Sequence, residues 1–224
     1  VPESDCYLLP EILSYEDAVM IEPTTIAVQA CSRAELVFED NLMIIGAGAL
    51  GSSILRIARL YNPHKIIMVD IEEEKLKESL ENGATDIINS KMEDVVEKAH
   101  ELTDGYGPTV VIDAACFHGS FLTACKCAGN AGRVITMGFG VDPDEINQFA
   151  ITSKELDVRG TKVIEPTISS PRSMEPLYGW HCPCCLKNSE YIFNTESSAR
   201  YDFSTNHLPI CPKYDENTKS CIIS

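Results

Sequence analysis

Short apolar runs alternate with helical patterns between residues 42 and 159, and this alternation restricts the possible folds more than any other feature of the chain. The runs are apolar almost throughout, as strands covered on both faces should be. Between them, apolar residues recur at the spacing of a buried helix face, at Ile54, Ile57, Ala58 and Tyr61 and again at Val95, Val96, Ala99 and Leu102. Strands are predicted at 42–45, 66–69, 86–88, 110–112, 134–137 and 156–159.

A strand and helix alternation of this kind predicts an α/β fold with a doubly wound, six-stranded parallel sheet, because parallel neighbours need crossover connections. Six strands is the number that a complete Rossmann dinucleotide-binding fold uses. A short helix is predicted over residues 15–21, ending at Pro23. After residue 162 the alternation stops. We therefore expect a linker segment at 1–22, a Rossmann domain at 23–162 and an irregular Cys-rich tail at 163–224.

Charge and hydropathy restrict the partners. The 224 residues carry a net charge of −16 and show no cluster of Lys and Arg, which argues against nucleic acid. No apolar run reaches the roughly 18 residues that a membrane-spanning helix needs. The N-terminal stretch also lacks the basic and apolar regions of a secretion signal. The sequence is therefore expected to be that of a cytoplasmic protein.

The ten cysteines fall into two groups. Cys6, Cys31, Cys116, Cys125 and Cys127 lie in apolar surroundings without the spacing of a disulfide framework, and they are predicted to be reduced core residues. A nucleophilic role is the alternative for Cys116, but no positioned base is visible in the sequence.

The remaining cysteines lie in the tail. Candidate metal ligands there are Cys182, Cys184, Cys185 and Cys211, beside His181 and His207. The C-x-C-C spacing is not the paired C-x-x-C of a zinc ribbon, so a metal site and a tail without metal both stay open. The final Cys-Ile-Ile-Ser has the C-a-a-X form of a prenylation signal. No polybasic stretch precedes it, so a chance match is the alternative and membrane attachment is not favoured.

Gly46, Gly48 and Gly51 form G-x-G-x-x-G directly after a predicted strand and directly before a predicted helix. The first glycine permits a tight turn, the second lets the backbone approach a pyrophosphate, and the third lets helix and strand pack closely. With Ala49 and Leu50, this turn would present free N–H groups and the positive end of a helix dipole to phosphates. A purely structural glycine turn is the alternative.

Asp70 ends the next predicted strand, where a carboxylate would accept hydrogen bonds from the adenosine ribose. Its charge would repel the 2′-phosphate of NADP, and the acidic residues that follow supply no Arg to attract it, so NAD is the expected cofactor. Lys75 lies one helical turn further on and is a candidate contact on the adenine side; a solvated helix Lys is the alternative.

These pieces occur in a recognisable order: "MIEPTTIAVQACSRA", "IIGAGALGSSILRIARL", "VDIEEEKLKESLENGATDIIN", "VVIDAACF" and "GRVITMGF". Over residues 1–162 the chain resembles the cofactor half of the zinc-dependent medium-chain alcohol dehydrogenases, in particular the sorbitol, threonine and sugar-acid dehydrogenases. The resemblance implies that backbone groups of Gly138 and Phe139 face the nicotinamide carboxamide. It also implies an alcohol or polyol substrate and, from the segment "ELDVRGT", a homo-oligomer.

The resemblance further implies a zinc ion, which in this family stabilises the alkoxide while the secondary alcohol passes a hydride to NAD. Glu22 matches a Glu that polyol dehydrogenases place at or beside this zinc; a helix-end carboxylate before Pro23 is the alternative. The G-H-E motif and the early Cys of the family's catalytic lobe are absent from the sequence, and residues 1–22 resemble only the end of that lobe. One carboxylate does not make a zinc site, so we expect the chain to be incomplete for catalysis alone. A non-catalytic dinucleotide-binding module and a metal-binding interaction protein are the alternative functions.

Overall fold

The structure is a computed structural model that describes residues 14–138, 145–161, 214–215 and 220–221. The chain divides into two compact units. One unit is Glu22–Val163 and the other combines Val1–Ile21 with Ile164–Ser224. Within the described ranges, no helix combines the length and apolar character that crossing a membrane requires.

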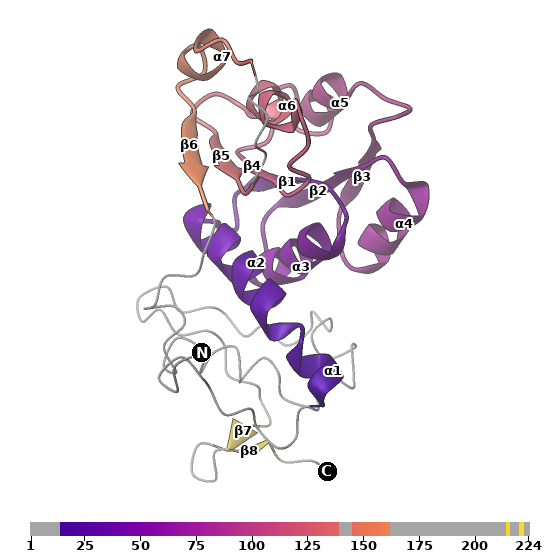
Figure 1. Cartoon of the computed structure of the whole chain (residues 1–224). Coiled ribbons are helices and arrows are strands. Elements are labelled where there is room, and N and C mark those ends of the chain that lie inside the picture. The colour runs from indigo at the N-terminus through magenta and orange to yellow at the C-terminus, as the bar shows by residue number, and fades with distance from the viewer. Residues whose placement is uncertain (1–13, 139–144, 162–213, 216–219, 222–224) are drawn as a thin grey trace. The chain divides into compact units, whose positions relative to one another are not determined.

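The larger unit contains a parallel sheet of six strands in the order β3-β2-β1-β4-β5-β6 (Figure 1). Every neighbouring pair is parallel, and the chain order reverses direction between β1 and β4. This is the doubly wound Rossmann topology, so the predicted fold class is confirmed. The strands are β1 (Asn41–Ile45), β2 (Lys65–Asp70), β3 (Asp86–Asn89), β4 (Val110–Asp113), β5 (Arg133–Thr136) and β6 (Asp157–Gly160).

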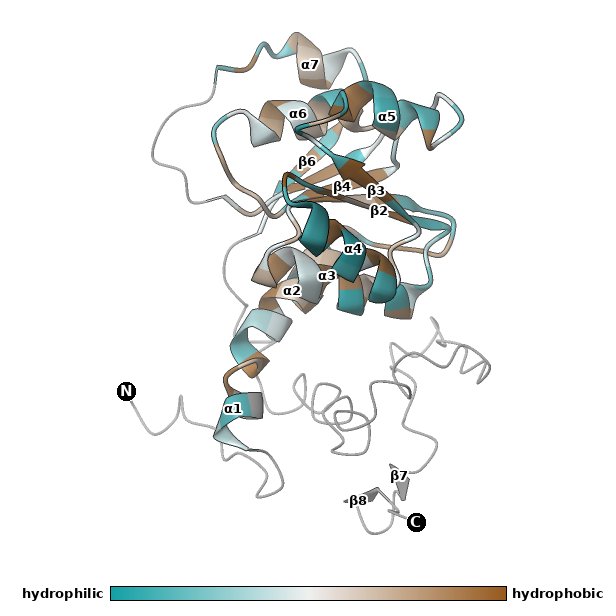
Figure 2. Ribbon diagram, turned by 90° about the vertical axis from the view of Figure 1, so that its right-hand side faces the viewer, coloured by the Kyte–Doolittle hydropathy of each residue, from teal (hydrophilic) through white to brown (hydrophobic). Residues whose placement is uncertain are grey.

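Helices cover both faces of this sheet (Figure 2). One layer holds α2 (Ile21–Arg33), α3 (Ala49–Ala58), which runs into a 3-10 turn at Arg59–Tyr61, and α4 (Glu73–Glu81). The opposite layer holds α5 (Val95–Glu101), α6 (Ser120–Cys127) and α7 (Phe149–Thr152). Because strands β1, β2 and β4 are apolar on both faces, each face buries its own set of side chains under a helical layer.

Side-chain alternation along the strands produces two core layers. On the α5 and α6 side, Met43 and Ile45 of β1 pack in one cluster with Val111 of β4 and Ala124 of α6. On the other side, Ile44 approaches α3 near Gly51. Both predicted helix faces are confirmed, since Ile54, Ile57 and Ala58 are buried and Ala99 is buried with Val95, Val96 and Leu102 packed beside it.

A partly buried ion pair joins the elements at the amino edge of the sheet, the end where its strands begin. The guanidinium of Arg133 on β5 donates to the carboxylate of Asp40, which directly precedes β1, and to the carbonyl oxygens of Ala34 and Glu35 at 2.7 and 2.6 Å. The hydroxyl of Thr109 donates to the same Asp40 carboxylate at 2.7 Å. These contacts fix the segment after α2 against β1, β4 and β5.

The predicted helix over residues 15–21 is wrong in extent. Helix α1 covers only Tyr15–Ala18, and α2 begins at Ile21 and continues through Pro23 to Arg33. Pro23 occupies the first turn of α2, where the backbone N–H that proline lacks would have no partner within the helix. The proline therefore starts a long helix here and does not end a short one.

In the smaller unit the structure describes α1, β7 (Tyr214–Asp215) and β8 (Ser220–Cys221). The two strands pair antiparallel, with Tyr214 opposite Cys221 and Asp215 opposite Ser220. The tail prediction named no strand in this segment. The other tail residues, including the candidate metal ligands Cys182, Cys184, Cys185 and Cys211, lie outside the described residues.

Candidate cofactor site

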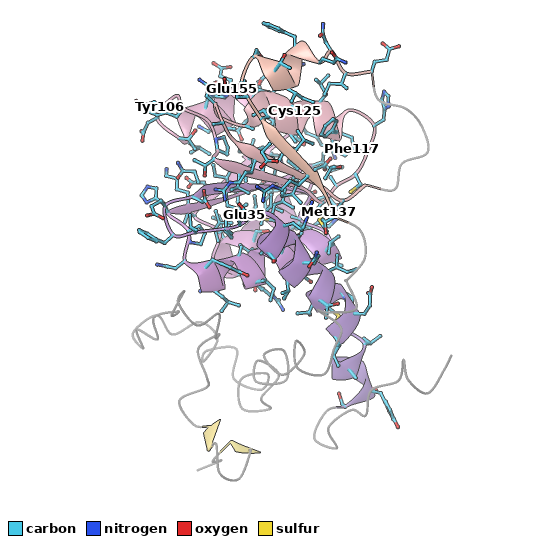
Figure 3. All side chains as sticks on the ribbon, turned by 90° about the vertical axis from the view of Figure 1, so that its left-hand side faces the viewer. Glu35, Tyr106, Phe117, Cys125, Met137 and Glu155 are labelled. Atoms are coloured by element: carbon cyan, nitrogen blue, oxygen red, sulfur yellow. The ribbon has the colours of Figure 1, made fainter. Side chains whose placement is uncertain are left out.

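The candidate site residues lie where the strands of the sheet end. The glycine turn follows β1, Asp70 ends β2, Asp113 ends β4 and Gly138 lies two residues after β5. Phe117 and Met137, which follow β4 and β5, lie together at this end of the sheet, whereas Tyr106 and Glu155 lie at the opposite end (Figure 3). Ligands of open α/β sheets bind at this carboxyl edge, next to the point where the strand order reverses.

The three glycines of the turn differ in how closely they are packed. Gly46 has a φ of 99°, and a Cβ there would lie 3.0 Å from both the Cβ and the backbone nitrogen of Ala115. A Cβ on Gly51 would lie 1.8 Å from the carbonyl oxygen of Gly46, so only glycine fits. Gly48 has no atom within 4 Å of the position of a Cβ. The turn is thus tightly packed at its first and third glycines and open at its second.

Helix α3 begins at this open position. Gly48 is its N-cap residue and provides no side-chain cap, and the first helical turn carries no acidic side chain. Ala49 is exposed and Leu50 is half-buried. The positive end of the helix dipole therefore faces the open side of the turn, an arrangement suited to an anion such as a pyrophosphate.

The carboxylate of Asp70 links the end of β2 to the turn. Its Oδ2 accepts a hydrogen bond from the backbone N–H of Ala47 at 2.7 Å, and its Oδ1 accepts from those of Ile71 and Glu72 at 2.8 and 3.0 Å. A carboxylate has about four acceptor positions, so these three bonds leave room for a ribose hydroxyl. The half-buried side chain is thereby held in one orientation beside the turn.

Lys75 lies on the first part of α4, close to the same carboxylate. Its ammonium group donates to Glu72 at 2.6 Å. This hydrogen bond raises the pKa of Lys75, and the charges of Glu72 and Asp70 add to the effect. The group is therefore cationic at neutral pH, and a nucleotide that used it would compete with Glu72.

The end of β4 supplies a second carboxylate, that of the buried Asp113. Its Oδ1 accepts from the backbone N–H groups of Ala115 and Cys116 at 3.2 and 3.1 Å, and its Oδ2 accepts from the hydroxyl of Ser120 at 2.6 Å. Sequence reasoning missed the role of Ser120. The polar Ser120 at the start of an otherwise buried helix face was the available signal.

Cys116 is half-buried beside Gly138, whose Cβ position would lie 3.7 Å from its sulfur. Burial, together with the charge of Asp113, raises the pKa of the Cys116 thiol to about 11. A thiol of this pKa stays protonated at neutral pH and is a weak nucleophile. Cys31, Cys116, Cys125 and Cys127 are all free thiols.

The described residues do not fit a zinc ion. Glu22 is exposed in the first turn of α2. Within the described part of the chain, no three His, Cys, Asp or Glu side chains gather closely enough to hold a metal. A catalytic zinc needs three protein ligands, so no chemical step is assigned to a metal in this unit.

Gly138 is exposed directly beyond β5, and Phe139 lies outside the described residues. A groove between α6 and the segment around α7, lined by residues that include Leu122, Lys126 and Phe149, shares no residue with the glycine turn. This groove is therefore separate from the candidate cofactor site at the carboxyl edge.

Comparison with known proteins agrees with this geometry. The starvation-sensing protein RspB of Escherichia coli K12 is 34% identical over 164 residues, which cover 73% of this chain and 48% of RspB. The sorbitol dehydrogenase of Arabidopsis thaliana is 31% identical over 163 residues, 71% of this chain and 45% of the plant enzyme. The chain thus spans about half the length of the curated relatives it matches.

Solved structures give the same result. The rspB protein of E. coli CFT073, described as a short chain alcohol dehydrogenase and crystallised with NADH, is 32% identical with a TM-score of 0.72, covering 80% of this chain and 52% of its own. A zinc-binding dehydrogenase of Sinorhizobium meliloti 1021, bound to NADP, is 25% identical with a TM-score of 0.69, covering 75% and 50%. A sequence model of the zinc-binding dehydrogenases matches residues 49–176. With the fold and the glycine turn, this match shows that the chain belongs to the zinc-binding dehydrogenase family.

Proposed function

We propose that this chain binds NAD and forms the cofactor-binding part of an alcohol or polyol dehydrogenase. The observation that carries the proposal is the pairing of an open Gly48 at the start of α3 with an Asp70 carboxylate fixed beside it. In this arrangement the N–H groups of Ala49 and Leu50 bind the pyrophosphate. The remaining acceptor position of Asp70 binds the adenosine ribose, and the backbone at Gly138 faces the nicotinamide.

NAD is preferred over NADP because of the charge around the ribose position. Asp70 is followed by Glu72, Glu73 and Glu74, which would repel a 2′-phosphate. The nearby cation, Lys75, is already paired with Glu72 at 2.6 Å. The NADP complex of the Sinorhizobium relative means that family membership alone does not decide this preference, so the test is made on this chain.

When bound, NAD supplies the acceptor for a hydride from a secondary alcohol carbon. The residues of this unit bind the dinucleotide and orient its nicotinamide at the carboxyl edge of the sheet. An alcohol or polyol substrate is supported by the family and by the sorbitol dehydrogenase relative. The alternative is a non-catalytic module that senses the dinucleotide, since the described residues offer no metal site.

Isothermal titration of the purified chain with NAD and NADP tests the proposal, with Asp70→Ala as the variant. We expect NAD to bind, NADP to bind much more weakly, and the variant to lose this preference. Asp86→Ala is the matched control, because Asp86 begins the neighbouring strand β3 at the opposite edge of the sheet and should leave the preference unchanged. A folded chain that binds neither nucleotide would overturn the proposal.

We further propose a homo-oligomer that forms through β6, which is an edge strand of the described sheet. Val158 and Arg159 are half-buried while Asp157 and Gly160 are exposed, and one side of the strand has no partner strand in the sheet. Such an edge is a template for pairing with a second copy. Sedimentation velocity should give a dimer for the chain and a monomer for Val158→Pro, which cannot donate to an added ladder. A wild-type monomer at micromolar concentration would contradict this.

A further inference from the structure

Asp113, the last residue of β4, is a buried carboxylate whose hydrogen bonds go to the connection between β4 and α6. It is 2% exposed, and its hydrogen-bond partner Ser120 is 1% exposed. One carboxylate oxygen holds the N–H groups of Ala115 and Cys116, and the other holds the hydroxyl of Ser120 at the start of α6. The Ser120 Oγ also lies 2.8 Å from the carbonyl oxygen of Phe117, so its single proton is shared between this oxygen and the Asp113 carboxylate. The connection from β4 to α6 is thereby tied to the Asp113 side chain.

The connection between β4 and α6 is in contact with the glycine turn. The Cβ and the nitrogen of Ala115 both lie 3.0 Å from the position that a Cβ on Gly46 would take. Cys116, the next residue, has a φ of 55°, a conformation that costs a non-glycine residue energy unless its surroundings hold it. The hydrogen bond from its N–H to Asp113 is one such constraint. Moving Ala115 would therefore change the surface against which Gly46 packs.

The turn is thus held between two carboxylates. Asp70 binds the N–H of Ala47 directly, while Asp113 acts through Ala115 on the neighbouring Gly46. We propose that Asp113, together with Ser120, is a positioning residue that sets the geometry of the glycine turn without touching the dinucleotide. The inference rests on the proposed function only in its effect on NAD affinity, because the geometry of the turn can be measured without ligand.

Asp113→Asn is the conservative variant, which should keep the hydrogen bonds that Asp113→Ala removes. Its side-chain oxygen still accepts from Ala115 and Cys116, and its amide can donate to the Ser120 oxygen while the Ser120 hydroxyl keeps its bond to Phe117. Alanine leaves the partly buried N–H groups of Ala115 and Cys116 without acceptors, which favours a rearranged connection. A structural role that depended only on negative charge would not be rescued by asparagine.

Asp40 provides a matched control. It is also a buried carboxylate, 3% exposed, that accepts from a backbone N–H, that of Val37 at 2.8 Å, and from a hydroxyl, that of Thr109. It pairs with Arg133 as well, so its loss removes at least as many contacts as the loss of Asp113. It lies before β1, at the opposite edge of the sheet from the turn. For Ser120→Ala the matched control is Thr103→Val, which removes a 3% exposed hydroxyl that bonds the Ala99 carbonyl oxygen at 2.7 Å.

The experiment measures two quantities on each folded variant: amide hydrogen exchange at Gly46 and Ala47 in the ligand-free chain, and NAD affinity by titration. We expect Asp113→Ala to speed exchange at both amides and to weaken NAD binding about tenfold, or ~1.4 kcal/mol. Asp113→Asn and Thr103→Val should stay close to wild type in both. Asp40→Ala, which also removes the partner of Arg133, should speed exchange at Gly46 and Ala47 no more than at other amides of the sheet. If Asp113→Ala does not fold, Ser120→Ala tests the proposal in its place. We then expect faster amide exchange at Gly46 and Ala47 and weaker NAD binding in Ser120→Ala than in Thr103→Val.

Wild-type exchange at Gly46 and Ala47 in a folded Asp113→Ala or Ser120→Ala chain would overturn the proposal. Equal changes in the control variants would also overturn it, because they would show a general loss of stability. If the wild-type chain binds no dinucleotide, the proposed function fails, and the exchange comparison still decides the positioning role of Asp113.

Discussion

At the scale of single residues, substituting alanine at two glycines of the turn should change the stability of the fold to different extents. Gly51→Ala would place a Cβ 1.8 Å from the Gly46 carbonyl oxygen, so α3 or the turn must move. Overpacking of this kind costs about 1–3 kcal/mol or more. We expect a clear loss of stability in urea unfolding together with loss of NAD binding.

Gly48→Ala is the companion variant. Its φ of −71° is open to any residue and nothing lies within 4 Å of the new Cβ. The fold should therefore lose less than about 1 kcal/mol, the difference between glycine and alanine at an N-cap. NAD affinity should nevertheless fall, because the methyl group occupies the side from which the pyrophosphate approaches. Full NAD affinity in Gly48→Ala would show that phosphates do not bind there.

The tight turn at Gly46 and the close helix packing at Gly51 could be predicted from spacing, because both follow from backbone geometry that recurs wherever a strand, a tight turn and a helix meet. The side-chain contacts around the turn could not. Nothing in the spacing of Asp113 and Ser120 says that they bond to each other, since that depends on how α6 enters its layer. Likewise Asp70 was predicted for the ribose, whereas its three bonds to backbone N–H groups follow only from the fold.

At the scale of elements, β6 is tied to the segment after α2 by ion pairs that respond to pH. Arg159 on β6 pairs with Glu35 at 2.8 Å and with Asp157 at 2.6 Å. Hydrogen bonds from Arg159 lower the pKa of both carboxyl groups in the folded chain. The pairs therefore stabilise the fold above the unfolded pKa values, about 4, and this contribution disappears as the pH falls through the lower folded values.

Removing Arg159 should reveal this dependence. In urea unfolding, Arg159→Met should be less stable than wild type at pH 7, and the difference should shrink towards pH 3 and in high salt, because the pairs are exposed and screened. Arg56→Met is the control, since Arg56 donates to the neutral side chain of Asn82 and should show a difference that is independent of pH. An Arg159→Met difference that stays constant from pH 7 to pH 3 would contradict the assignment.

Element boundaries show where sequence reasoning succeeded and failed. All six strands of the sheet were predicted to within two residues of their ends, because buried parallel strands give continuous apolar runs. Helix α2 was missed because a proline is compatible with both the end of one helix and the first turn of the next. Choosing between them requires knowing that Ala27, Ala30 and Cys31 are buried, which depends on the packing of α2.

At the scale of the whole molecule, the proposed cofactor site and the catalytic chemistry of the family require different sets of residues. The dinucleotide site needs only the ends of β1, β2, β4 and β5, all within Glu22–Val163. A zinc-activated alcohol needs three metal ligands, and the described residues bring no such group together. The proposed cofactor binding therefore does not depend on the metal ligands that turnover requires.

This separation predicts the outcome of an activity assay. The 224-residue polypeptide, supplied with NAD, zinc and a panel of polyols that includes sorbitol, should form NADH no faster than a sample without protein, while the same sample binds NAD in titration. A full-length relative such as RspB serves as the comparison for NAD binding, since its crystal structure holds NADH. Turnover that depends on added zinc would contradict the prediction and would exclude the non-catalytic alternative. It would also place the missing ligands in segments outside the described residues, where zinc content and Cys182→Ser, Cys184→Ser and Cys211→Ser variants would locate them.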